Sequence, residues 1–269
     1  RRSARRTVRA SGSRQRLVQS AVRIGVVIPV FNERALVRAA VERVLATPPP
    51  VMANGTRCER RIVLVDDGST DGTREVVREL AGMAGVVAVF HEGNRGKGAA
   101  LRTGFATALA GGVDVVLVHD ADLEYDPADH AAVLAPILDG RADTVIGSRF
   151  IGLTHRVLYF WHAVANRGIS LLCGMATNLN LTDVECCSKA FTRRVLERVT
   201  IEEERFGVEI ELIAKVARLR LEDATGTRQP RVYEVAVTYA GRTYAEGKKI
   251  GWRDGVAALG CIWKYGVIG

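Results

Sequence analysis

Short apolar runs alternate with helical patterns through the first half of the chain, and this alternation restricts the possible folds more than any other feature. Five runs have the length and β-branched content of buried strands: residues 24–30, 61–65, 86–90, 115–118 and 144–147. Helices are expected between them, over about 32–45, 74–81, 98–110 and 127–138. Apolar strands that alternate with helices predict an α/β fold, in which helices cover both faces of a mostly parallel sheet.

Polar segments follow four of these predicted strands, at residues 32–33, 66–67, 94–98 and 120–124. Ligands of parallel sheets bind beyond the carboxyl ends of the strands, where neighbouring loops meet. We therefore expect the four segments to converge on one rim of the sheet and to form the binding site.

Three acidic residues, Asp120, Asp122 and Glu124, directly follow the fourth strand. Alternate side chains of an extended chain share one face, so these carboxylates are expected to lie together. Crowded carboxylates repel one another unless a cation lies between them, and hard oxygen ligands suit Mg2+ or Mn2+. The stretch predicts a metal site, with a solvated acidic turn as the alternative. The neighbouring His119 is expected to pack under the rim rather than to bind the metal.

The glycine-rich segment 93–98 suggests phosphate binding by backbone amides at the start of a helix, with Lys97 facing the phosphate. A plain glycine turn is the alternative. The segment lacks the Ser or Thr of a P-loop, and no GxGxxG follows the first strand. Both absences argue against the hypotheses of a P-loop NTPase and of a dinucleotide-binding protein. Asp66 or Asp67 is a candidate acceptor of hydrogen bonds from a base or ribose, and one of them is alternatively a turn cap.

The second half of the chain is expected to form the acceptor side of one compact domain. It contains an amphipathic stretch over 157–174, a segment at 181–191, a helix near 206–219, a strand over 232–238 and a last helix from about Lys248. No uninterrupted apolar run reaches the roughly 18 residues that a membrane span needs. The stretches 157–176 and 256–268 are candidates for lying on a membrane surface. Trp161 and Trp252 suit such an interface or a core.

Charge is concentrated at the N-terminus of the chain. The net charge is +8, and eight arginines precede the first acidic residue, Glu33, so that 30 basic and 30 acidic residues remain. Residues 1–23 are therefore predicted to form a basic arm, a type of segment that is most often disordered. Such an arm can bind anionic lipid or nucleic acid without specificity. The arm lacks the apolar region of a signal peptide, and the five cysteines show no CxxC spacing, so a cytoplasmic protein with reduced thiols is expected.

Taken in order, the motifs resemble those of family 2 glycosyltransferases of the type A (GT-A) fold. The resemblance rests on residues 27–33, 65–73, 96–98 and 120–122, and segments 146–150, 166–168 and 182–183 are similar to the dolichyl- or polyprenyl-phosphate sugar synthases. It covers roughly 24–260. It implies a Rossmann-like single domain over 24–269, with a nucleotide-sugar-binding half at 24–150 and an acceptor-binding half with further helices at 151–269.

The resemblance also implies a GDP- or UDP-sugar donor with its base near Asp67. A Mg2+ or Mn2+ ion would be held by Asp120, Asp122 and Glu124, although these synthases often carry Gln at the position of Glu124. The ion would neutralise charge on the departing diphosphate, and inversion implies direct attack by the acceptor. The full set of donor-binding candidates is Pro29, Phe31, Glu33, Asp66, Asp67, Lys97, Asp120, Ala121 and Asp122.

The nature of the acceptor decides which residues the reaction needs. A lipid phosphate is already ionised and needs cations to hold it, whereas a hydroxyl needs a carboxylate base. Arg149 and Arg167 match the family's phosphate-contacting arginines. Asp183 is a candidate base, or a residue that orients the acceptor loop.

Two further segments bear on the acceptor side. Residues 184–189 depart from the synthases' usual Ser-Gly-Phe-Arg/Lys element, and Cys186 and Cys187 are expected to pack rather than to bridge. Arg242 and Lys248 lie in a segment that resembles the mobile loop of these enzymes and is expected to close over the diphosphate; a solvated basic loop is the alternative.

The function hypothesis is a metal-dependent, inverting transferase that moves a hexose from a nucleotide sugar to a polyprenyl-type phosphate at the cytoplasmic membrane surface. One alternative keeps the donor and replaces the acceptor with a hydroxyl of a soluble metabolite, nucleoside or glycan. Another is a non-catalytic nucleotide-sugar-binding protein. No specific nucleic-acid partner is expected, because the arm lacks interleaved aromatics. A nucleotidyltransferase would carry a glycine-rich loop where this chain has Phe31-Asn32-Glu33.

Overall fold

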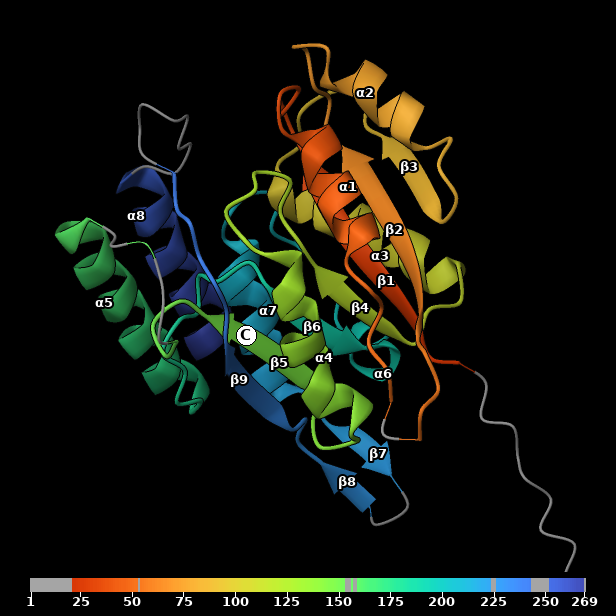
Figure 1. Ribbon diagram of the computed structural model, residues 1–269. Helices are drawn as coiled ribbons and strands as arrows, with labels where there is room; N and C mark the ends of the chain where they lie inside the picture. The colour runs from red at the N-terminus through yellow and green to blue at the C-terminus, as the bar shows by residue number, and fades with distance from the viewer. Residues whose placement is uncertain are drawn as a thin grey trace, which may run out of the picture.

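The computed structural model describes residues 21–52, 54–152, 156, 159–223, 226–242 and 252–268. Seven strands form one sheet in the order β3-β2-β1-β4-β6-β5-β9 (Figure 1). They are β1 Arg23–Val30, β2 Glu59–Asp66, β3 Val86–Phe90, β4 Val115–Val118, β5 Thr144–Ser148, β6 Lys189–Thr192 and β9 Val232–Ala236. A separate hairpin pairs β7 Leu221–Asp223 with β8 Gly226–Arg228.

The helices are α1 Val37–Ala46, α2 Thr73–Leu80, α3 Lys97–Ala110, α4 His130–Leu138, α5 Phe160–Thr177, α6 Arg193–Leu196, α7 Val208–Arg218 and α8 Trp252–Cys261. A 3-10 turn, Pro127–Asp129, leads into α4, and a π-helical segment, Ile262–Ile268, continues α8. No helix of the described residues is long and apolar enough to cross a membrane.

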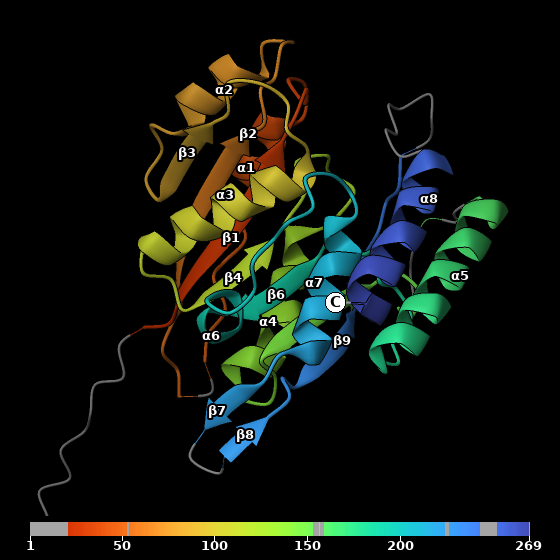
Figure 2. The ribbon, with the colours of Figure 1, turned by 180° about the vertical axis from the view of Figure 1, so that it is seen from behind.

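The predicted α/β fold with a mostly parallel sheet is confirmed. Successive side chains of a strand point to opposite faces of the sheet and enter two separate core clusters. Ile24, Val26 and Ile28 of β1 point into one core cluster with α1, α2 and α4. Val27 points the other way, into a cluster with α3 and α7. Figures 1 and 2 show the helices on opposite faces of the sheet. Helices therefore cover both faces of the central strands, as continuous apolar strands require.

One strand and two turns differ from the sequence expectations. β6 runs antiparallel to both β4 and β5, so the sheet is not wholly parallel. Helix α1 begins at Val37 rather than at residue 32, because Asn32 has a positive φ of 51° that a helix cannot continue through. The expectation that residues 120–124 are extended is wrong, since they form a turn in which Leu123 has a φ of 62°.

A third layer lies beyond the end of the sheet. α5, α8 and the π-helical segment pack against α7, and all four contribute to one apolar cluster. In Figure 2, α5 is the helix farthest from the central strands, and it contacts both α7 and α8. The core of this layer comes from Cys173, Ile213, Ala258 and Ile262, together with Ile146 of β5.

Candidate active site

The rim at the carboxyl ends of β1, β2 and β4 gathers the predicted donor-side residues. The parallel register sets the ends of β1 and β2 level, since Val30 pairs with Asp66, and β4 ends three residues short of them, where Val118 pairs with Val27. The segments that follow each strand therefore meet, as the sequence predicted. Among the candidates, Pro29 and Phe31 are half-buried at the end of β1, and Ala121 is buried after β4.

The acidic cluster of the rim is built around Arg242. Its guanidinium contacts three carboxylates: Nη2 lies 3.1 Å from Asp122 Oδ2 and 3.3 Å from Glu33 Oε1, and Nε lies 3.1 Å from Glu124 Oε1. The Arg242 backbone N–H also donates to Glu124 Oε1 over 2.9 Å. These side chains are 10–18% exposed, so the pairs are largely shielded from water. Residues 120–124 form a turn rather than an extended segment, but Asp122 and Glu124 still both contact Arg242.

The electrostatics of this cluster suit an added cation. Burial, reinforced by the nearby Asp120 and Glu124 charges, raises the pKa of Asp122 to about 7. Among the described residues, no three His, Cys, Asp or Glu side chains already converge as a metal site. Two aspartates with hard oxygen ligands nevertheless fit a Mg2+ or Mn2+ site of the kind that substrate phosphates complete. Asp120 and Asp122 would hold such an ion, and Glu124 lies beside them.

Asp120 belongs to a buried series of carboxylates and lysines that alternate in charge and contact one another. Lys97 Nζ lies 3.0 Å from Asp120 Oδ1 and 3.1 Å from Glu209 Oε1, and Glu209 also pairs with Lys189. Lys189 and Glu209 are almost completely buried. Burial lowers the pKa of Lys97, but the Asp120, Cys187 and Glu209 charges outweigh it and raise the pKa well above its usual value. Lys97 is therefore a charged residue that contacts carboxylates, and its predicted phosphate contact stays a prediction.

Asp66 and Asp67 are both buried where β2 ends. Asp67 accepts hydrogen bonds from the backbone N–H groups of Arg95 (3.1 Å) and Gly96 (2.7 Å), and its Oδ1 lies 2.7 Å from His91 Nδ1. Asp67 thus fixes the glycine-rich loop at the start of α3. Asp66 lies 3.3 Å from Arg74 Nε. The predicted contact of either residue with a base or ribose remains a prediction.

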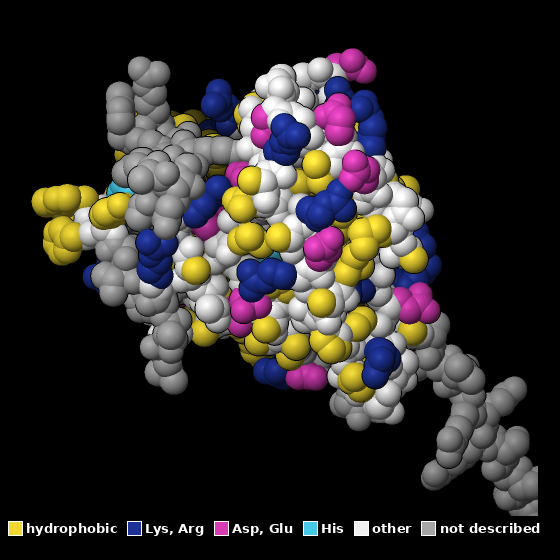
Figure 3. All heavy atoms as spheres, turned by 45° about the horizontal axis from the view of Figure 1, so that its top comes forward, with side chains coloured by type: hydrophobic (Ala, Val, Ile, Leu, Met, Phe, Trp, Pro, Cys, Tyr) yellow, Lys and Arg dark blue, Asp and Glu magenta, His cyan; other side chains and the backbone are white. Residues whose placement is uncertain are grey.

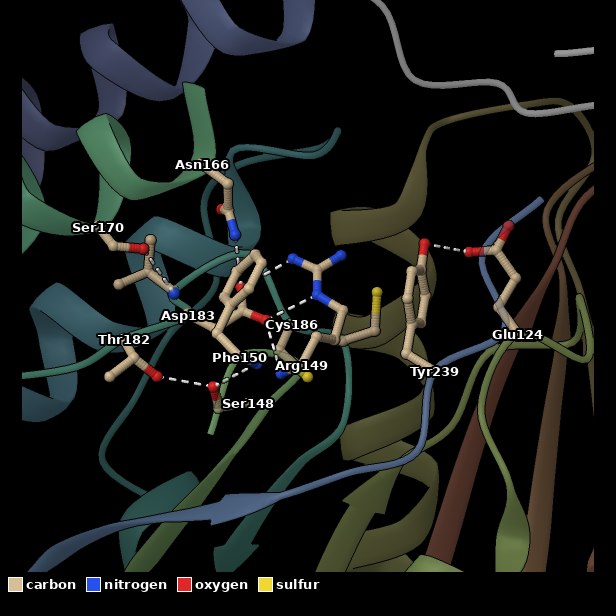
Figure 4. Close-up of polar contacts among 12 residues, drawn as sticks. Glu124, Ser148, Arg149, Phe150, Asn166, Ser170, Thr182, Asp183, Cys186 and Tyr239 are labelled. Carbon is tan, nitrogen blue, oxygen red and sulfur yellow. Dashed lines mark hydrogen bonds and ion pairs between the residues drawn. The ribbon is translucent and has the colours of Figure 1, made fainter. Parts of the chain in front are cut away.

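On the acceptor side, Asp183 holds Arg149 in a two-pronged ion pair (Figure 4). Arg149 Nε and Nη2 donate to the two Asp183 oxygens over 2.6 and 2.7 Å, and Asn166 Nδ2 donates to Oδ1 over 2.9 Å. Asp183 is completely buried. Burial raises its pKa, but the bonds and charge of Arg149 and the bond from Asn166 bring the pKa below its usual value. The geometry favours the orienting role of Asp183 over that of a free base.

Tyr239 connects the acceptor side to the acidic cluster. The Arg149 guanidinium lies 5.1 Å from the centre of the Tyr239 ring, and the Tyr239 hydroxyl donates to Glu124 Oε2 over 2.6 Å. Figure 4 shows the tyrosine ring between the arginine and the glutamate. Glu124 therefore contacts Arg242 on one side and Tyr239 on the other, which places the two halves of the site next to each other.

Arg167 is exposed on the wall of an open groove of about 600 Å³. The groove is lined by Phe150, Arg167, Ser170, Leu171, Gly174, Met175, Asn178, Leu179, Asn180, Leu181 and Thr182. Phe150 and Thr182 adjoin the Arg149–Asp183 pair, so one end of the groove lies next to it. Lys248, the other predicted loop cation, lies outside the described residues.

Several residues of the site were missed by the sequence reasoning. Glu209 was overlooked because an acid in an amphipathic helix usually faces water; the signal was that its neighbours Val208, Ile210 and Leu212 leave no polar face there. Its partner Lys189 begins β6, a strand that was not expected. Tyr239 begins the segment that was expected to close over the diphosphate, but no role of its own was predicted for it. His119 is buried as expected, with its Nδ1 3.1 Å from Nε2 of His130. The cysteines, including Cys186 and Cys187, are free.

Comparison with known proteins gives a family and a fold. Residues 25–200 match the family model described as glycosyl transferase family 2. An undecaprenyl-phosphate 4-deoxy-4-formamido-L-arabinose transferase from Aeromonas hydrophila is 29% identical over 227 residues, 84% of this chain and 62% of that protein. An undecaprenyl-phosphate mannosyltransferase from Micrococcus luteus is 28% identical over 249 residues, 88% of this chain and 92% of that protein.

Among solved structures, glucosyl-3-phosphoglycerate synthase from Mycobacterium tuberculosis, in complex with Mn2+, UDP and phosphoglyceric acid, has a TM-score of 0.66. It is 20% identical, and the match covers 92% of this chain and 80% of that one. At this identity the likeness establishes the fold, a Rossmann-like sheet of the GT-A type.

Proposed function

Because the chain belongs to glycosyl transferase family 2, we propose that it moves a hexose from a GDP- or UDP-sugar to the phosphate of a polyprenyl-type lipid. The reaction depends on a divalent metal and inverts the anomeric centre. The relatives named above support this acceptor, since both act on undecaprenyl phosphate according to their names. The chain spans only 62% of the length of the Aeromonas protein, so the proposal concerns the transferase domain itself.

The observation that carries the proposal is the engagement of Asp183 with Arg149. A hydroxyl acceptor needs a carboxylate that is free to take its proton. Asp183 is the acceptor-side aspartate singled out for that role, and both of its oxygens accept hydrogen bonds from Arg149. An acceptor that is already an anion needs no base. The pair then serves to hold the Arg149 guanidinium in place for a phosphate.

Arg167 and its groove give the acceptor a second contact. The groove combines an exposed arginine with Phe150, Leu171, Met175 and Leu181 along its wall. A ligand with an anionic head and an apolar chain matches that combination, because its head meets cations while its chain meets carbon. A small polar metabolite would leave the apolar wall in water.

On the donor side, the chain's own residues orient the nucleotide sugar. Asp67 fixes the glycine-rich loop before α3 by accepting hydrogen bonds from the backbone N–H groups of Arg95 and Gly96. A divalent cation held by Asp120 and Asp122 would supply positive charge that stabilises the departing nucleoside diphosphate. Lys97 holds Asp120 in position, and Arg242 would exchange its carboxylate contacts for the diphosphate.

The transfer does not require a proton to be removed from the acceptor phosphate. An oxygen of the lipid phosphate forms a bond to the anomeric carbon while the bond from that carbon to the diphosphate oxygen breaks on the opposite face. The electron pair leaves with the nucleoside diphosphate. Arg149 orients the attacking phosphate, and the Tyr239 ring against its guanidinium limits the arginine's freedom.

A donor-by-acceptor screen tests the proposal. The full chain with Mn2+ is offered UDP- and GDP-hexoses together with a short-chain prenyl phosphate, the matching prenyl alcohol, or 3-phosphoglycerate. Release of nucleoside diphosphate is expected with the prenyl phosphate, and Arg149→Lys should raise the KM for it more than it lowers kcat with a saturating acceptor. Transfer to a hydroxyl acceptor, with none to the phosphate, would contradict the proposal.

A further inference from the structure

The outward side of α5 is apolar over most of its length. Trp161, Val164, Leu171, Leu172 and Met175 are all exposed, and they recur at intervals of three, four and seven residues, which places them on one side of the helix. Trp161 and Met175 are 75% and 74% exposed. Burying Trp161 in a core was the alternative from sequence, and this exposure excludes it within the described chain.

The C-terminal helical segment carries a second exposed row. Val256, Leu259, Trp263 and Val267 repeat at helical spacing along α8 and its π-helical continuation, and Trp263 is 62% exposed. The opposite side of this segment, with Ala258, Cys261 and Ile262, is buried in the cluster shared with α7. Its apolar exposure is therefore confined to the side away from the core.

The two rows lie on neighbouring helices. α5 contacts both α8 and the π-helical segment, and a Cβ added at Gly266 would stand 2.8 Å from Ala176 Cβ, so the backbones pack closely. In Figures 1 and 2 the helices run side by side at one end of the molecule. Figure 3 shows hydrophobic side chains projecting at the edge where α5 lies. We call these nine residues the outer apolar face.

The chemistry of this face selects its occupant. α5 contains no Asp or Glu, and the one acid of the C-terminal helical segment, Asp254, lies in the first turn of α8 before the exposed row begins. The two rows themselves therefore carry few charges that would repel a phosphate-rich surface. Arg167 is exposed on α5, and Lys264 lies 3.2 Å from Glu203 at the edge of the second row. Exposed tryptophans on otherwise apolar helices are typical of the boundary between headgroups and acyl chains. A patch of this extent on a soluble protein marks an interaction site.

The acceptor groove connects to the same face. Leu171 and Met175 belong to the outer apolar face and also line the groove that holds Arg167. A second copy of the chain docked on this face would bury those two residues and cover the groove. A bilayer would instead supply the groove with lipid. The choice of a bilayer over a second copy of the chain therefore rests on the proposed function. The exposure of the two apolar rows does not depend on that proposal.

We propose that the outer apolar face is a membrane-docking surface that rests in the headgroup region of a phospholipid bilayer and opens the acceptor groove toward the lipid. The face lies parallel to the membrane and does not cross it. Its tryptophans enter the headgroup boundary, and Arg167 faces the lipid phosphates.

Vesicle co-sedimentation of the full chain tests the proposal. Phosphatidylcholine vesicles without any polyprenyl phosphate are used in high salt, which screens the eight arginines that precede Glu33. The double variant Trp161→Gln/Trp263→Gln removes the two indoles, and Val51→Gln/Met83→Gln is a matched control, since these residues are exposed but lie outside the face. The unmodified chain and the control should bind, and the tryptophan variant should bind at least about tenfold more weakly.

Equal vesicle binding by the tryptophan variant, or failure of the unmodified chain to bind, would overturn the proposal. A dimer in size-exclusion chromatography that Trp161→Gln/Trp263→Gln dissociates would assign the face to a second copy instead. Transfer to a water-soluble prenyl phosphate without vesicles separates the two proposals. Transfer without vesicle binding would remove the docking surface alone, whereas binding without transfer to any prenyl phosphate would remove the acceptor class alone.

Discussion

At the donor rim the four acidic residues nearest the predicted metal site meet cations of the chain itself, whereas on the outer apolar face two tryptophans stay mostly exposed. Arg242 lies among Glu33, Asp122 and Glu124, and Lys97 lies against Asp120. The comparison separates two ways of binding. A ligand at the rim must exchange with contacts that already exist, while a lipid at the outer face only adds contacts. Variants at the rim should therefore change metal affinity, and variants at the outer apolar face should not.

The largest effect is expected from Glu209→Ala, which breaks the charge chain under the rim. The change leaves Lys189 buried without its carboxylate and removes one partner of Lys97. Uncompensated buried charges typically cost about 3–5 kcal/mol, so the free energy of unfolding should fall by about that amount. Urea denaturation measures it. Glu211→Ala, a second buried glutamate of α7, is the comparison for fold effects, since it pairs with Lys215 and not with Lys97.

If Glu209 also positions Lys97, activity and stability will respond differently in the two variants. Glu209→Ala should lower kcat at a temperature where the protein is still folded, and Glu211→Ala should not. Equal kcat values in the two variants would confine Glu209 to a structural role.

Asp122→Asn should lower kcat by roughly 10²–10³-fold, because the donor site loses one of the two aspartates assigned to the metal. The isosteric amide removes the charge whose burial beside Asp120 and Glu124 raises the pKa of Asp122, so the free energy of unfolding should not fall. Mn2+ titration by electron paramagnetic resonance gives a readout that is independent of turnover. Undiminished Mn2+ binding by the variant would contradict the assignment of Asp122 to the metal.

Acid should destabilise the protein through the histidine pair under the rim. Burial, with the neighbouring His119 and Arg60, lowers the pKa of His130 to about 3, so the histidine is neutral in the folded state. The unfolded state, with a pKa near 6.5, binds the proton first, so this stability is fully present above about pH 6.5 and is lost as the pH falls toward 3. The cost is up to about 1.4 kcal/mol per pH unit.

Urea denaturation between pH 7 and 4.5 measures this loss. His130→Gln should flatten the slope of the unfolding free energy against pH by as much as one proton. An unchanged slope would show that other groups control the acid sensitivity.

Local apolar runs predicted most strands of the sheet, because the pattern of a buried strand lies within its own few residues. All five strands expected in the first half, such as Val86–Phe90, appear within two residues of their expected bounds, and β2, which begins two residues before its expected start, deviates most. The antiparallel insertion of β6 was missed, since strand order depends on partners distant in sequence. The turn at Leu123 was missed because a positive φ is uncommon for leucine.

For the site, sequence identified single residues better than their partners. Arg242 was predicted to contact a diphosphate, and that stays a prediction; the sequence did not indicate its contact with Glu33, 209 positions away. Asp183 had two open roles, and the sequence did not show its ion pair with Arg149, which favours the orienting role. Motif spacing reports which segments follow strands. It does not report which of their charges neutralise each other, and this pairing decides whether a residue is free to act.

The smallest expected effect, and the most direct test of exchange at the rim, is that Arg242→Gln tightens Mn2+ binding several-fold in the absence of donor. In the structure this arginine supplies the positive charge next to Asp122 and Glu124, so a metal ion must compete with it. Removing a competing charge across a partly exposed contact is worth about 1 kcal/mol, close to a fivefold change in Kd. Arg141→Gln, which removes an exposed arginine that pairs with Asp139, controls for net charge. Weaker Mn2+ binding by Arg242→Gln would mean that the arginine organises the carboxylates rather than competing for them. The rim would then bind its ligands by addition, as the outer apolar face does.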